Sequence, residues 1–298
     1  MSTPPLDDRD GHIWLDGRLV PWRDARLHVL THGLHYGGGV FEGERVYDGH
    51  VFKLTEHSQR LHDSARELGF DIPFSVAELD GATLELVARQ GIGDGYVRPV
   101  AWRGSEQISV AGAGTSVHVA IAAWEWPHVF SADAKNSGIR LGTSRWRRPA
   151  PDTAPVRAKA ASLYNICTLA RDAADADGFD DALLLDYRGL VAEATGANIF
   201  LVTGEELHTP TADCFLAGIT RATVLDLARE LGIRVVERDV RPEELGGFDE
   251  CFLTGTAYEV QPVRSIDAHE YRVGRTTTAL QEAYTELVRA TNRTAALR

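Results

Sequence analysis

The chain has no excess of positive charge. Its 298 residues include 43 acidic and 31 basic side chains, which gives a formal net charge of −12 at pH 7. Proteins that bind nucleic acid need a basic face to displace the counterions of the phosphate backbone, so this composition argues against a nucleic-acid partner. An anionic small-molecule ligand stays open, because a pocket can be locally positive inside an acidic protein.

Cysteines and long hydrophobic runs are also scarce. The three cysteines, Cys167, Cys214 and Cys251, are far apart and without metal-ligand spacing. They favour reduced cytosolic thiols over a disulfide framework or a metal centre. No apolar run approaches the roughly 20 residues that cross a bilayer. Residues 1–11 lack the basic start and apolar core of a signal peptide. We therefore expect a cytoplasmic protein with no membrane partner.

Two patterns of hydrophobic residues predict a two-domain α/β (α+β) fold. Residues 1–127 indicate a smaller N-terminal α+β domain, and residues 139–298 alternate between strand and helix patterns, as in a larger α/β domain. In the first domain we expect hairpins around Asp16-Gly17 and Asp48-Gly49, helices at 55–68 and 75–90, and strands at 96–102 and 117–126. Residues 128–138 form the predicted interdomain linker. Small-molecule sites tend to lie in the cleft between two such domains.

Lysine is the rarest basic residue. Of 31 lysines and arginines, only Lys53, Lys135 and Lys159 are lysines. Arginine cannot lose its proton to attack a carbonyl carbon, whereas a buried lysine can. Lys159 lies between Ala158 and Ala160, which leave room for a planar ligand, so it is the candidate for chemistry. On composition alone, a lysine retained by chance stays the alternative.

Two further segments are candidates for binding charged groups. Glu193 lies among small apolar residues, and a buried carboxylate needs a cationic or N–H partner. A protonated pyridine nitrogen would serve, and so would an arginine in a purely structural pair. The glycine turn at Gly218 precedes a predicted helix at 219–231, whose first N–H groups could bind an anion. The same sequence pattern is also typical of an ordinary helix N-terminus that binds no ligand.

Three histidines raise the question of a metal site. His28, His32 and His35 would share one face of a helix, but Gly33 and the glycines at 37–39 argue against a helix there. We expect no metal site. The chain also has no nucleophile elbow, Walker loop or CxxC pair.

Taken together, these segments resemble the fold-type IV enzymes that use pyridoxal 5′-phosphate (PLP), and most closely the branched-chain amino-acid aminotransferases. Each block alone is weak, but their order and spacing are specific. The blocks are Thr31–Gly37, Val40–Arg45, Glu56–Leu61, Tyr96–Pro99, Ala158–Ala160, Glu193–Phe200, Gly218–Arg221 and Thr254–Ala257.

The resemblance implies roles around the cofactor. Lys159 would hold PLP as a Schiff base and then move the proton between the substrate Cα and the cofactor. Glu193 would keep the pyridine nitrogen protonated, and Tyr164 would hydrogen-bond the phenolic oxygen. The residues expected to hold the phosphate or to pack on the ring are Arg60, Ile219, Thr220, Thr256 and Leu216.

The resemblance also implies a substrate side and a partner. The α-carboxylate would meet Tyr96 and Ala257, and Arg98 would orient it and accept the second carboxylate of glutamate or 2-oxoglutarate. The remaining residues expected at the substrate are Phe41, Gly43, Tyr258 and Tyr36, the last of which would enter the neighbouring subunit's site. A homodimer or a larger oligomer follows, with ping-pong exchange between amino acids and 2-oxo acids.

Several alternatives remain open at this point. The chain could be a sibling enzyme, such as a D-amino-acid or (R)-amine aminotransferase or an aminodeoxychorismate lyase. It could serve specialised metabolism, or it could have kept the fold as a non-catalytic binding protein. Three departures from the branched-chain pattern leave the amino donor open: Tyr258 at a position that is commonly small, the glycines at 37–39, and the loop at 104–116.

Overall fold

The computed structural model describes residues 5–126 and 132–295. By its internal contacts the chain divides into two units: Met1–Pro127 with Ala158–Ser162, and His128–Arg157 with Leu163–Arg298. Residues 158–162 therefore belong to the first unit, although the sequence pattern grouped them with the second domain. The predicted linker at 128–138 starts in residues outside the described part, and the rest of it contains helix α4 (Ala132–Ser137).

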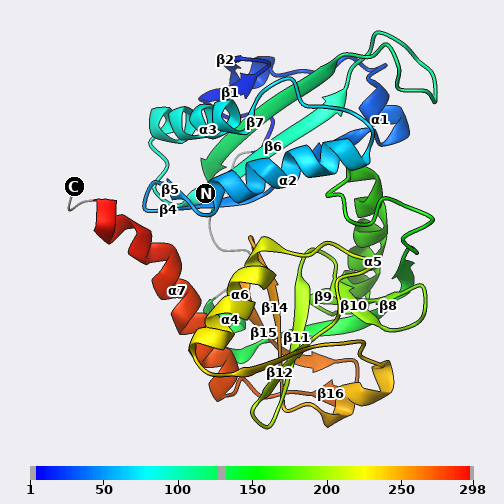
Figure 1. The fold of residues 1–298 in the computed structure, drawn as a ribbon, viewed down its shortest axis with the longest axis vertical. Coiled ribbons are helices and arrows are strands. Elements are labelled where there is room, and N and C mark those ends of the chain that lie inside the picture. Colours follow the sequence, from blue (N-terminus) through cyan, green and yellow to red (C-terminus); the bar gives the residue numbers. More distant parts are fainter. Residues whose placement is uncertain (1–4, 127–131, 296–298) are drawn as a thin grey trace. The chain divides into compact units, whose positions relative to one another are not determined.

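The first unit is an antiparallel sheet with two long helices on it (Figure 1). The strand order is β2-β1-β7-β6-β4-β5, with β3 also paired to β6. The strands are β1 (His12–Leu15), β2 (Arg18–Pro21), β3 (Gly39–Phe41), β4 (Glu44–Tyr47), β5 (His50–Val51), β6 (Gly95–Arg103) and β7 (Val117–Glu125). The helices are the 3-10 turn η1 (Trp22–Asp24), α1 (His32–Tyr36), α2 (Leu54–Glu67) and α3 (Val76–Gln90).

Local turn and cap chemistry fixes much of this unit. Both predicted Asp-Gly hairpins are confirmed: Asp16 and Asp48 have φ of 47° and 48°, the left-handed values that a type I′ turn requires. Ser75 and Glu78 form the predicted capping box of α3. The short helix α1 was not expected. Gly37, at φ 65°, ends this helix rather than preventing it.

The core of the first unit lies between the sheet and the helices. Leu61 of α2 and Leu86 of α3 are fully buried against Val97 of β6 and Ile121 of β7. Alternate residues of β6 point away from the helices, as the two-residue period of a strand requires. Tyr96 and Arg98 are placed by this alternation on the opposite side from Val97.

The second unit is built on a mixed sheet whose pairings close into a ring, β10-β9-β8-β15-β14-β11, because β11 also pairs with β10. The ring strands are β8 (Ile139–Arg148), β9 (Asp181–Asp186), β10 (Val191–Ala194), β11 (Asn198–Thr203), β14 (Glu250–Gly255) and β15 (Glu259–Ile266). The remaining strands are β12 (Glu206–Thr209), β13 (Arg234–Glu237) and β16 (His269–Glu270).

Helices cover the outside of this sheet. The helical segments are η2 (Ala161–Leu163), α5 (Tyr164–Ala176), α6 (Ile219–Glu230), η3 (Pro242–Gly247) and α7 (Arg275–Ala295). Helix α5 packs on β8 and β9, while α6 and α7 pack on each other and on β14. At one end of the ring, the start of β9 and the turns β10–β11 and β14–β15 meet, because Asn198 is opposite Thr254 and Ala194 is opposite Leu183.

Candidate active site

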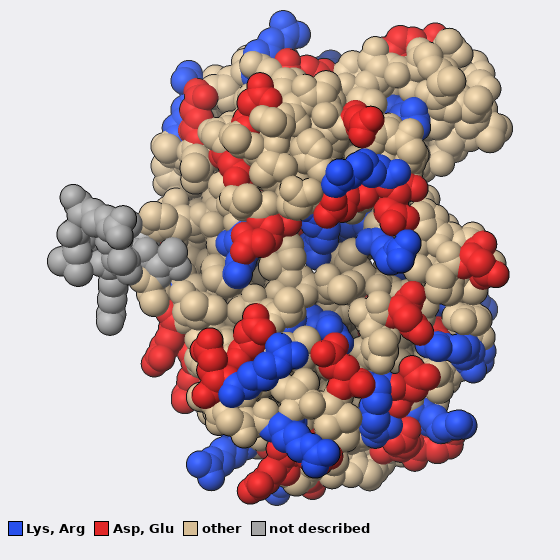
Figure 2. All heavy atoms as spheres, viewed as in Figure 1, with Lys and Arg blue, Asp and Glu red and all other residues tan. Residues whose placement is uncertain are grey.

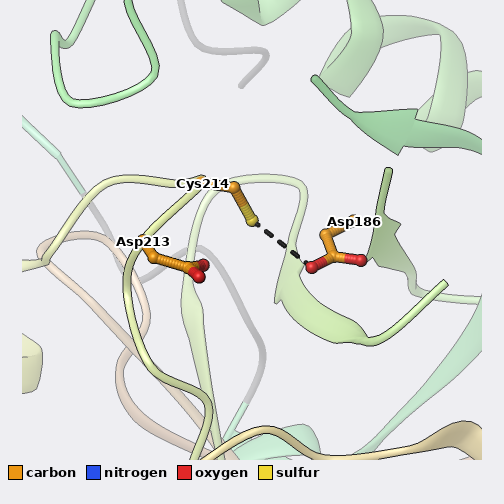
Figure 3. Close-up of side chains that lie close together, drawn as sticks. All are labelled: Asp186, Asp213 and Cys214. Atoms are coloured by element: carbon orange, nitrogen blue, oxygen red, sulfur yellow. Dashed lines mark hydrogen bonds between the residues drawn. The ribbon is translucent and has the colours of Figure 1, made fainter. Parts of the chain in front are cut away.

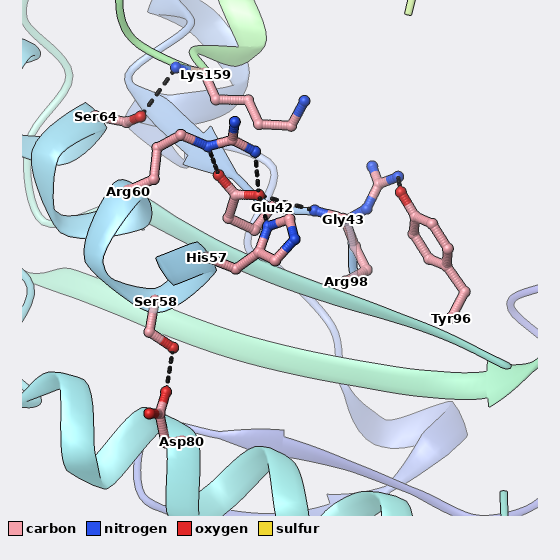
Figure 4. Close-up of polar contacts among 10 residues, drawn as sticks. All are labelled: Glu42, Gly43, His57, Ser58, Arg60, Ser64, Asp80, Tyr96, Arg98 and Lys159. Atoms are coloured by element: carbon pink, nitrogen blue, oxygen red, sulfur yellow. Dashed lines mark hydrogen bonds and ion pairs between the residues drawn. The ribbon is translucent and has the colours of Figure 1, made fainter. Parts of the chain in front are cut away.

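Lys159 is fastened to the first unit by its backbone. Its N–H donates to Ser64 Oγ at 2.9 Å, and its carbonyl accepts the Phe41 N–H at 3.1 Å. The next residue, Ala160, pairs with Val40 in an antiparallel bridge. Figure 4 shows the Lys159 side chain extending from the backbone that Ser64 holds. Its Nζ lies 5.0 Å from the centroid of the Phe41 ring. The backbone bonds therefore fix the position from which the Lys159 side chain extends.

Arg60 is aimed by a buried carboxylate. Its Nε lies 2.6 Å from Glu42 Oε1 and its Nη2 lies 2.8 Å from Oε2, a two-pronged ion pair. His57 Nδ1 is 2.7 Å from the same carboxylate (Figure 4). Burial alone would raise the pKa of Glu42, but the charge and hydrogen bonds of Arg60, with the hydrogen bond of His57, hold it below its ordinary value. Burial lowers the pKa of His57, so its ring is neutral near pH 7. Arg60 is then the cation that balances the charge of Glu42.

Tyr96, Arg98 and Phe41 form a second cationic group in the first unit. Arg98 Nη2 donates to the Tyr96 hydroxyl at 3.2 Å. The guanidinium lies over Phe41, with Cζ 4.8 Å from the ring centroid. Among the described residues, Arg98 Nε is buried and has no hydrogen-bond partner. A guanidinium held this way retains donor capacity for an anion.

Gly43 and two tryptophans shape the space around Tyr96. A Cβ on Gly43 would lie 1.9 Å from the Tyr96 hydroxyl oxygen, so only glycine fits there. The Tyr96 ring meets Trp126 edge to face at 4.5 Å between centroids, and Trp124 at 5.4 Å. Sequence reasoning did not identify Trp126. The contact has no local motif, because it depends on the β6–β7 register.

Tyr36 lies at the end of α1 and is 43% exposed, with its ring 4.8 Å from that of His32. The three nearby histidines are not gathered around a common point. His28 Nδ1 accepts the Leu30 N–H at 3.2 Å, and His35 Nε2 is 2.8 Å from a backbone carbonyl. In the described ranges, these histidines form no metal-ligand cluster.

In the second unit, Glu193 is 9% exposed, and its partners include Arg148 and Asn198. Arg148 Nε lies 3.2 Å from its Oε1, and Asn198 Nδ2 donates to its Oε2 at 3.4 Å. Asn198 also donates to the Leu216 carbonyl at 3.0 Å and accepts the Gly218 N–H at 3.1 Å. One amide side chain thus ties the carboxylate to the turn before α6. Arg148 is the arginine partner that the sequence left open, and it keeps a negative charge on Glu193 tolerable in a buried position.

The start of α6 has the makings of an anion site. Gly218 is its N-cap and supplies no side-chain cap, so the first N–H groups of the helix, at Ile219 and Thr220, lack an intrahelical acceptor. In the β14–β15 turn, the N–H groups of Thr256 and Ala257 also donate no hydrogen bond within the described part of the chain. Both segments offer backbone donors to a negatively charged ligand.

Three other predicted residues have defined surroundings. Tyr164 begins α5 and packs beside Cys167 and Ala170. Leu216 is half-buried in the turn that Asn198 holds. Tyr258 is 8% exposed, and its hydroxyl donates to Asp181 at 2.7 Å.

Asp186, Asp213 and Cys214 form an acidic cluster whose ligand atoms are close enough together to resemble a metal site. Cys214 Sγ lies 3.7 Å from Asp186 Oδ2, with Asp213 nearby (Figure 3). Arg188 bridges the two carboxylates, at 2.7 Å from Asp186 and 3.0 Å from Asp213. Burial and the neighbouring charge of Asp186 raise the pKa of Cys214 to about 12. A metal ion would have to displace the thiol proton of Cys214, and the Arg188 guanidinium already neutralises the two carboxylates.

The surface and helices add two observations. On the face drawn in Figure 2, basic and acidic side chains are interspersed, and that face has no extended basic region. Within the residues that the structure describes, no helix combines the length and the apolar character needed to traverse a bilayer.

Comparison with known proteins identifies the class. The profile of the amino-transferase class IV family matches residues 39–266, and the chain belongs to this family. It is 45% identical to the probable branched-chain-amino-acid aminotransferase of Rickettsia felis, over 90% of this chain and 91% of the relative. It is 43% identical to the branched-chain-amino-acid aminotransferase of Pseudomonas aeruginosa, over 95% of this chain and 94% of the relative.

A solved structure agrees with the sequence relatives. The branched-chain amino acid aminotransferase of Thermobaculum terrenum, in its PLP-bound form, has a TM-score of 0.87 and 32% sequence identity, covering 94% of each chain. The predicted family and its fold-type IV architecture are confirmed by these similarities.

Sequence reasoning missed the residues that support the candidates. Glu42 and Asn198 stood inside recognisable blocks, and each is a polar side chain in a small or apolar stretch, which was the available signal. His57 also stood inside a block, Glu56–Leu61, but its pairing with Glu42, 15 residues away, is set by tertiary packing. Arg148 stood in no block, and its partner Glu193 is 45 residues away.

Proposed function

We propose that this protein is a PLP-dependent aminotransferase that exchanges the amino group of L-leucine, L-isoleucine or L-valine with 2-oxoglutarate. Its family and the names of its relatives support the reaction class and the substrate. The observation that carries the proposal is Lys159, one of three lysines in the chain, whose backbone is fixed by Ser64 and Phe41.

The residues present suit PLP. A phosphate needs backbone donors and a cation, which the uncapped start of α6 and Arg60 supply. A pyridine nitrogen that must stay protonated needs a buried carboxylate, which Glu193 supplies. An aldehyde needs an amine, which Lys159 supplies.

The chain's residues then have distinct tasks. PLP, when bound, supplies an electron-accepting ring that stabilises negative charge at the substrate Cα. Lys159 would take the proton from the substrate Cα as a general base and then deliver it to the cofactor as a general acid. Glu193 holds a proton on the pyridine nitrogen, and Tyr164 hydrogen-bonds the phenolic oxygen. The residues proposed to hold the phosphate and the ring face are Arg60, Ile219, Thr220, Thr256 and Leu216.

On the substrate side, two groups would bind carboxylates. Tyr96 and the backbone at Ala257 receive the α-carboxylate, and Arg98 orients it. The unpaired Nε of Arg98 supports its second task of accepting the distal carboxylate of 2-oxoglutarate. The residues proposed to enclose the substrate side chain are Phe41, Gly43, Tyr258 and the partner subunit's Tyr36.

We extend the proposal to a homodimer, because Tyr36 is exposed in the single chain and could reach a neighbouring copy. A cytoplasmic location suits the three cysteines, which are buried thiols and form no disulfide in the described residues. We retain residues 1–127 and 139–298 as the proposed domains, with the contribution of residues 158–162 to the first unit added.

A half-reaction assay tests the function. Protein loaded with PLP is mixed separately with L-Leu, L-Val, L-Ile, L-Glu, D-Ala and (R)-1-phenylethylamine, and the change in cofactor absorbance is followed. The four L-amino acids should convert the absorbance band, whereas D-Ala and the amine should leave it unchanged. Conversion by D-Ala with none by L-Leu would overturn the proposed substrate and favour a D-amino-acid aminotransferase.

A further inference from the structure

A buried carboxylate ties together three segments at one end of the ring of strands in the second unit. Asp181, at the start of β9, is completely buried. Its Oδ2 accepts the Tyr258 hydroxyl at 2.7 Å and its Oδ1 accepts the Thr195 hydroxyl at 2.5 Å. The N–H of Ala182 donates to the same Oδ1 at 2.7 Å, and Arg171 Nη1 lies 4.0 Å away.

The two hydroxyl donors come from the two turns that carry candidate site residues. Thr195 is two residues after Glu193, in the β10–β11 turn. Tyr258 directly follows Thr256 and Ala257, in the β14–β15 turn. Strand pairing brings these two turns together, and Asp181 adds side-chain hydrogen bonds to both of them.

The Tyr258 ring also fills the space between the glycines of these turns. A Cβ on Gly196 would lie 3.4 Å from the ring, and a Cβ on Gly255 would lie 3.5 Å from it. The same Cβ on Gly255 would lie 3.1 Å from the Gly196 carbonyl oxygen. The ring thus packs against both turns, and the bond from its hydroxyl to Asp181 fixes its orientation.

This arrangement is costly unless every bond is made. A carboxylate removed from water is tolerated only when donors compensate it, and Asp181 has four groups around it. Burial and the charge of Asp181 raise the pKa of Tyr258 well above its ordinary value, so the hydroxyl stays a donor over the working pH range. The hydroxyl is directed at Asp181 rather than at a ligand.

We propose that Tyr258 is a positioning residue for the substrate carboxylate: anchored on Asp181, it holds the turn at Thr256 and Ala257 against the turn at Gly196 in the conformation that binds the anion. This inference rests on the proposed function and deepens it. It replaces a direct substrate contact of the Tyr258 hydroxyl with an indirect role. It also gives a purpose to a tyrosine at a position that is commonly small.

The test uses a carboxylate ligand that binds without reacting. 4-Methylvalerate is the leucine skeleton without the amine, so it can bind but cannot react. Its Kd is measured by titrating the cofactor absorbance of PLP-loaded wild type, Tyr258→Phe and Tyr271→Phe. Tyr271 is a matched control, because it is 7% exposed in the same hydrophobic core. Its hydroxyl donates to the backbone carbonyl of Leu245 at 3.1 Å and not to Asp181.

Tyr258→Phe should raise the Kd of 4-methylvalerate and the KM of L-leucine about five- to tenfold, with kcat changed less than about threefold. Tyr271→Phe should lower the melting temperature without changing Kd. A Kd in Tyr258→Phe equal to that of the wild type, with a lower melting temperature, would overturn the inference and leave the hydroxyl purely structural. A wild-type protein that binds PLP but never responds to 4-methylvalerate would overturn the proposed substrate instead.

A second pair of variants tests the inference independently, in case Tyr258→Phe does not fold. Thr195→Val removes the other hydroxyl donor to Asp181, and Thr195→Ser keeps it. Thr195→Val should raise the Kd of 4-methylvalerate and Thr195→Ser should restore it. Equal Kd values in both variants and in the wild type would contradict the inference.

Discussion

Glu42 and Glu44 are two residues apart and both are completely buried, yet their pKa values move in opposite directions. Glu42 accepts the two-pronged bond of Arg60 and the bond of His57, and its pKa falls. Within the part of the chain that the structure describes, the Glu44 carboxyl oxygens have no hydrogen-bond partner. Burial, with the nearby negative charge of Glu42, raises the pKa of Glu44 well above its ordinary value. In the pH range between their two pKa values, Glu42 is therefore expected to be ionised and Glu44 to be protonated.

This contrast predicts unequal effects of the same substitution. Glu42→Gln should lower the free energy of unfolding by about 3 kcal/mol, because it leaves the Arg60 charge without its partner. It should also weaken PLP binding, since Arg60 loses the group that aims it. Glu44→Gln replaces a neutral carboxyl with a neutral amide and should change stability by less than about 1 kcal/mol at pH 5. Urea unfolding and PLP titration of both variants check this, and equal losses would contradict the assignment of charge.

The pH dependence of stability separates the two residues further. Glu44 has a raised folded pKa, so its contribution is intact below its ordinary value of 4.5 and is lost as pH rises toward the folded pKa. Glu42 has a lowered folded pKa, so its contribution is intact above 4.5 and is lost as pH falls below it. Glu44→Gln should therefore become progressively more stable than the wild type as pH rises above 4.5. Parallel curves of unfolding free energy against pH for the two proteins would show that Glu44 is ionised in the fold.

Gly43 predicts a steric effect on substrate binding. Gly43→Ala places a methyl group where the Tyr96 hydroxyl lies, so Tyr96 and the bonded Arg98 must shift. Overpacking costs about 1–3 kcal/mol, and KM for L-leucine should rise by about tenfold or more. The control is Gly81→Ala in α3, where a Cβ meets nothing within 4 Å. It should stabilise the helix by about 0.5–1 kcal/mol and leave KM unchanged. A KM in Gly43→Ala that matches the control would count against the role of Tyr96.

Arg98 predicts a selective loss of dicarboxylates. Arg98→Gln keeps polarity but removes the charge, and a charge-assisted bond is worth about 1.5–3 kcal/mol. KM for 2-oxoglutarate should rise at least tenfold more than KM for 4-methyl-2-oxopentanoate, because only the former has a distal carboxylate. Steady-state kinetics with both acceptors measures the ratio. An equal rise for the two acceptors would restrict Arg98 to the α-carboxylate.

The elements that sequence predicts best are those specified locally. Asp16-Gly17 and the Ser75 capping box depend on residues within one turn, and both formed as expected. Lys159 became a candidate because lysine is rare in this chain, and the family resemblance gave it its expected role. The Asp181–Tyr258 bond joins residues 77 positions apart, so no local sequence pattern predicts it. The placement of residues 158–162 with the first unit likewise depends on long-range contacts, such as the bond from Lys159 to Ser64.

The central claim is that Lys159 carries the cofactor, and one measurement tests it directly. PLP-loaded protein is reduced with borohydride, digested, and the pyridoxyl-bearing peptide is sequenced by mass spectrometry. The chain's three lysines make the result unambiguous. We predict that the label lies on Lys159 and that Lys159→Ala retains no label and no transaminase activity. A label on Lys53 or Lys135, or one that persists in Lys159→Ala, would contradict the account.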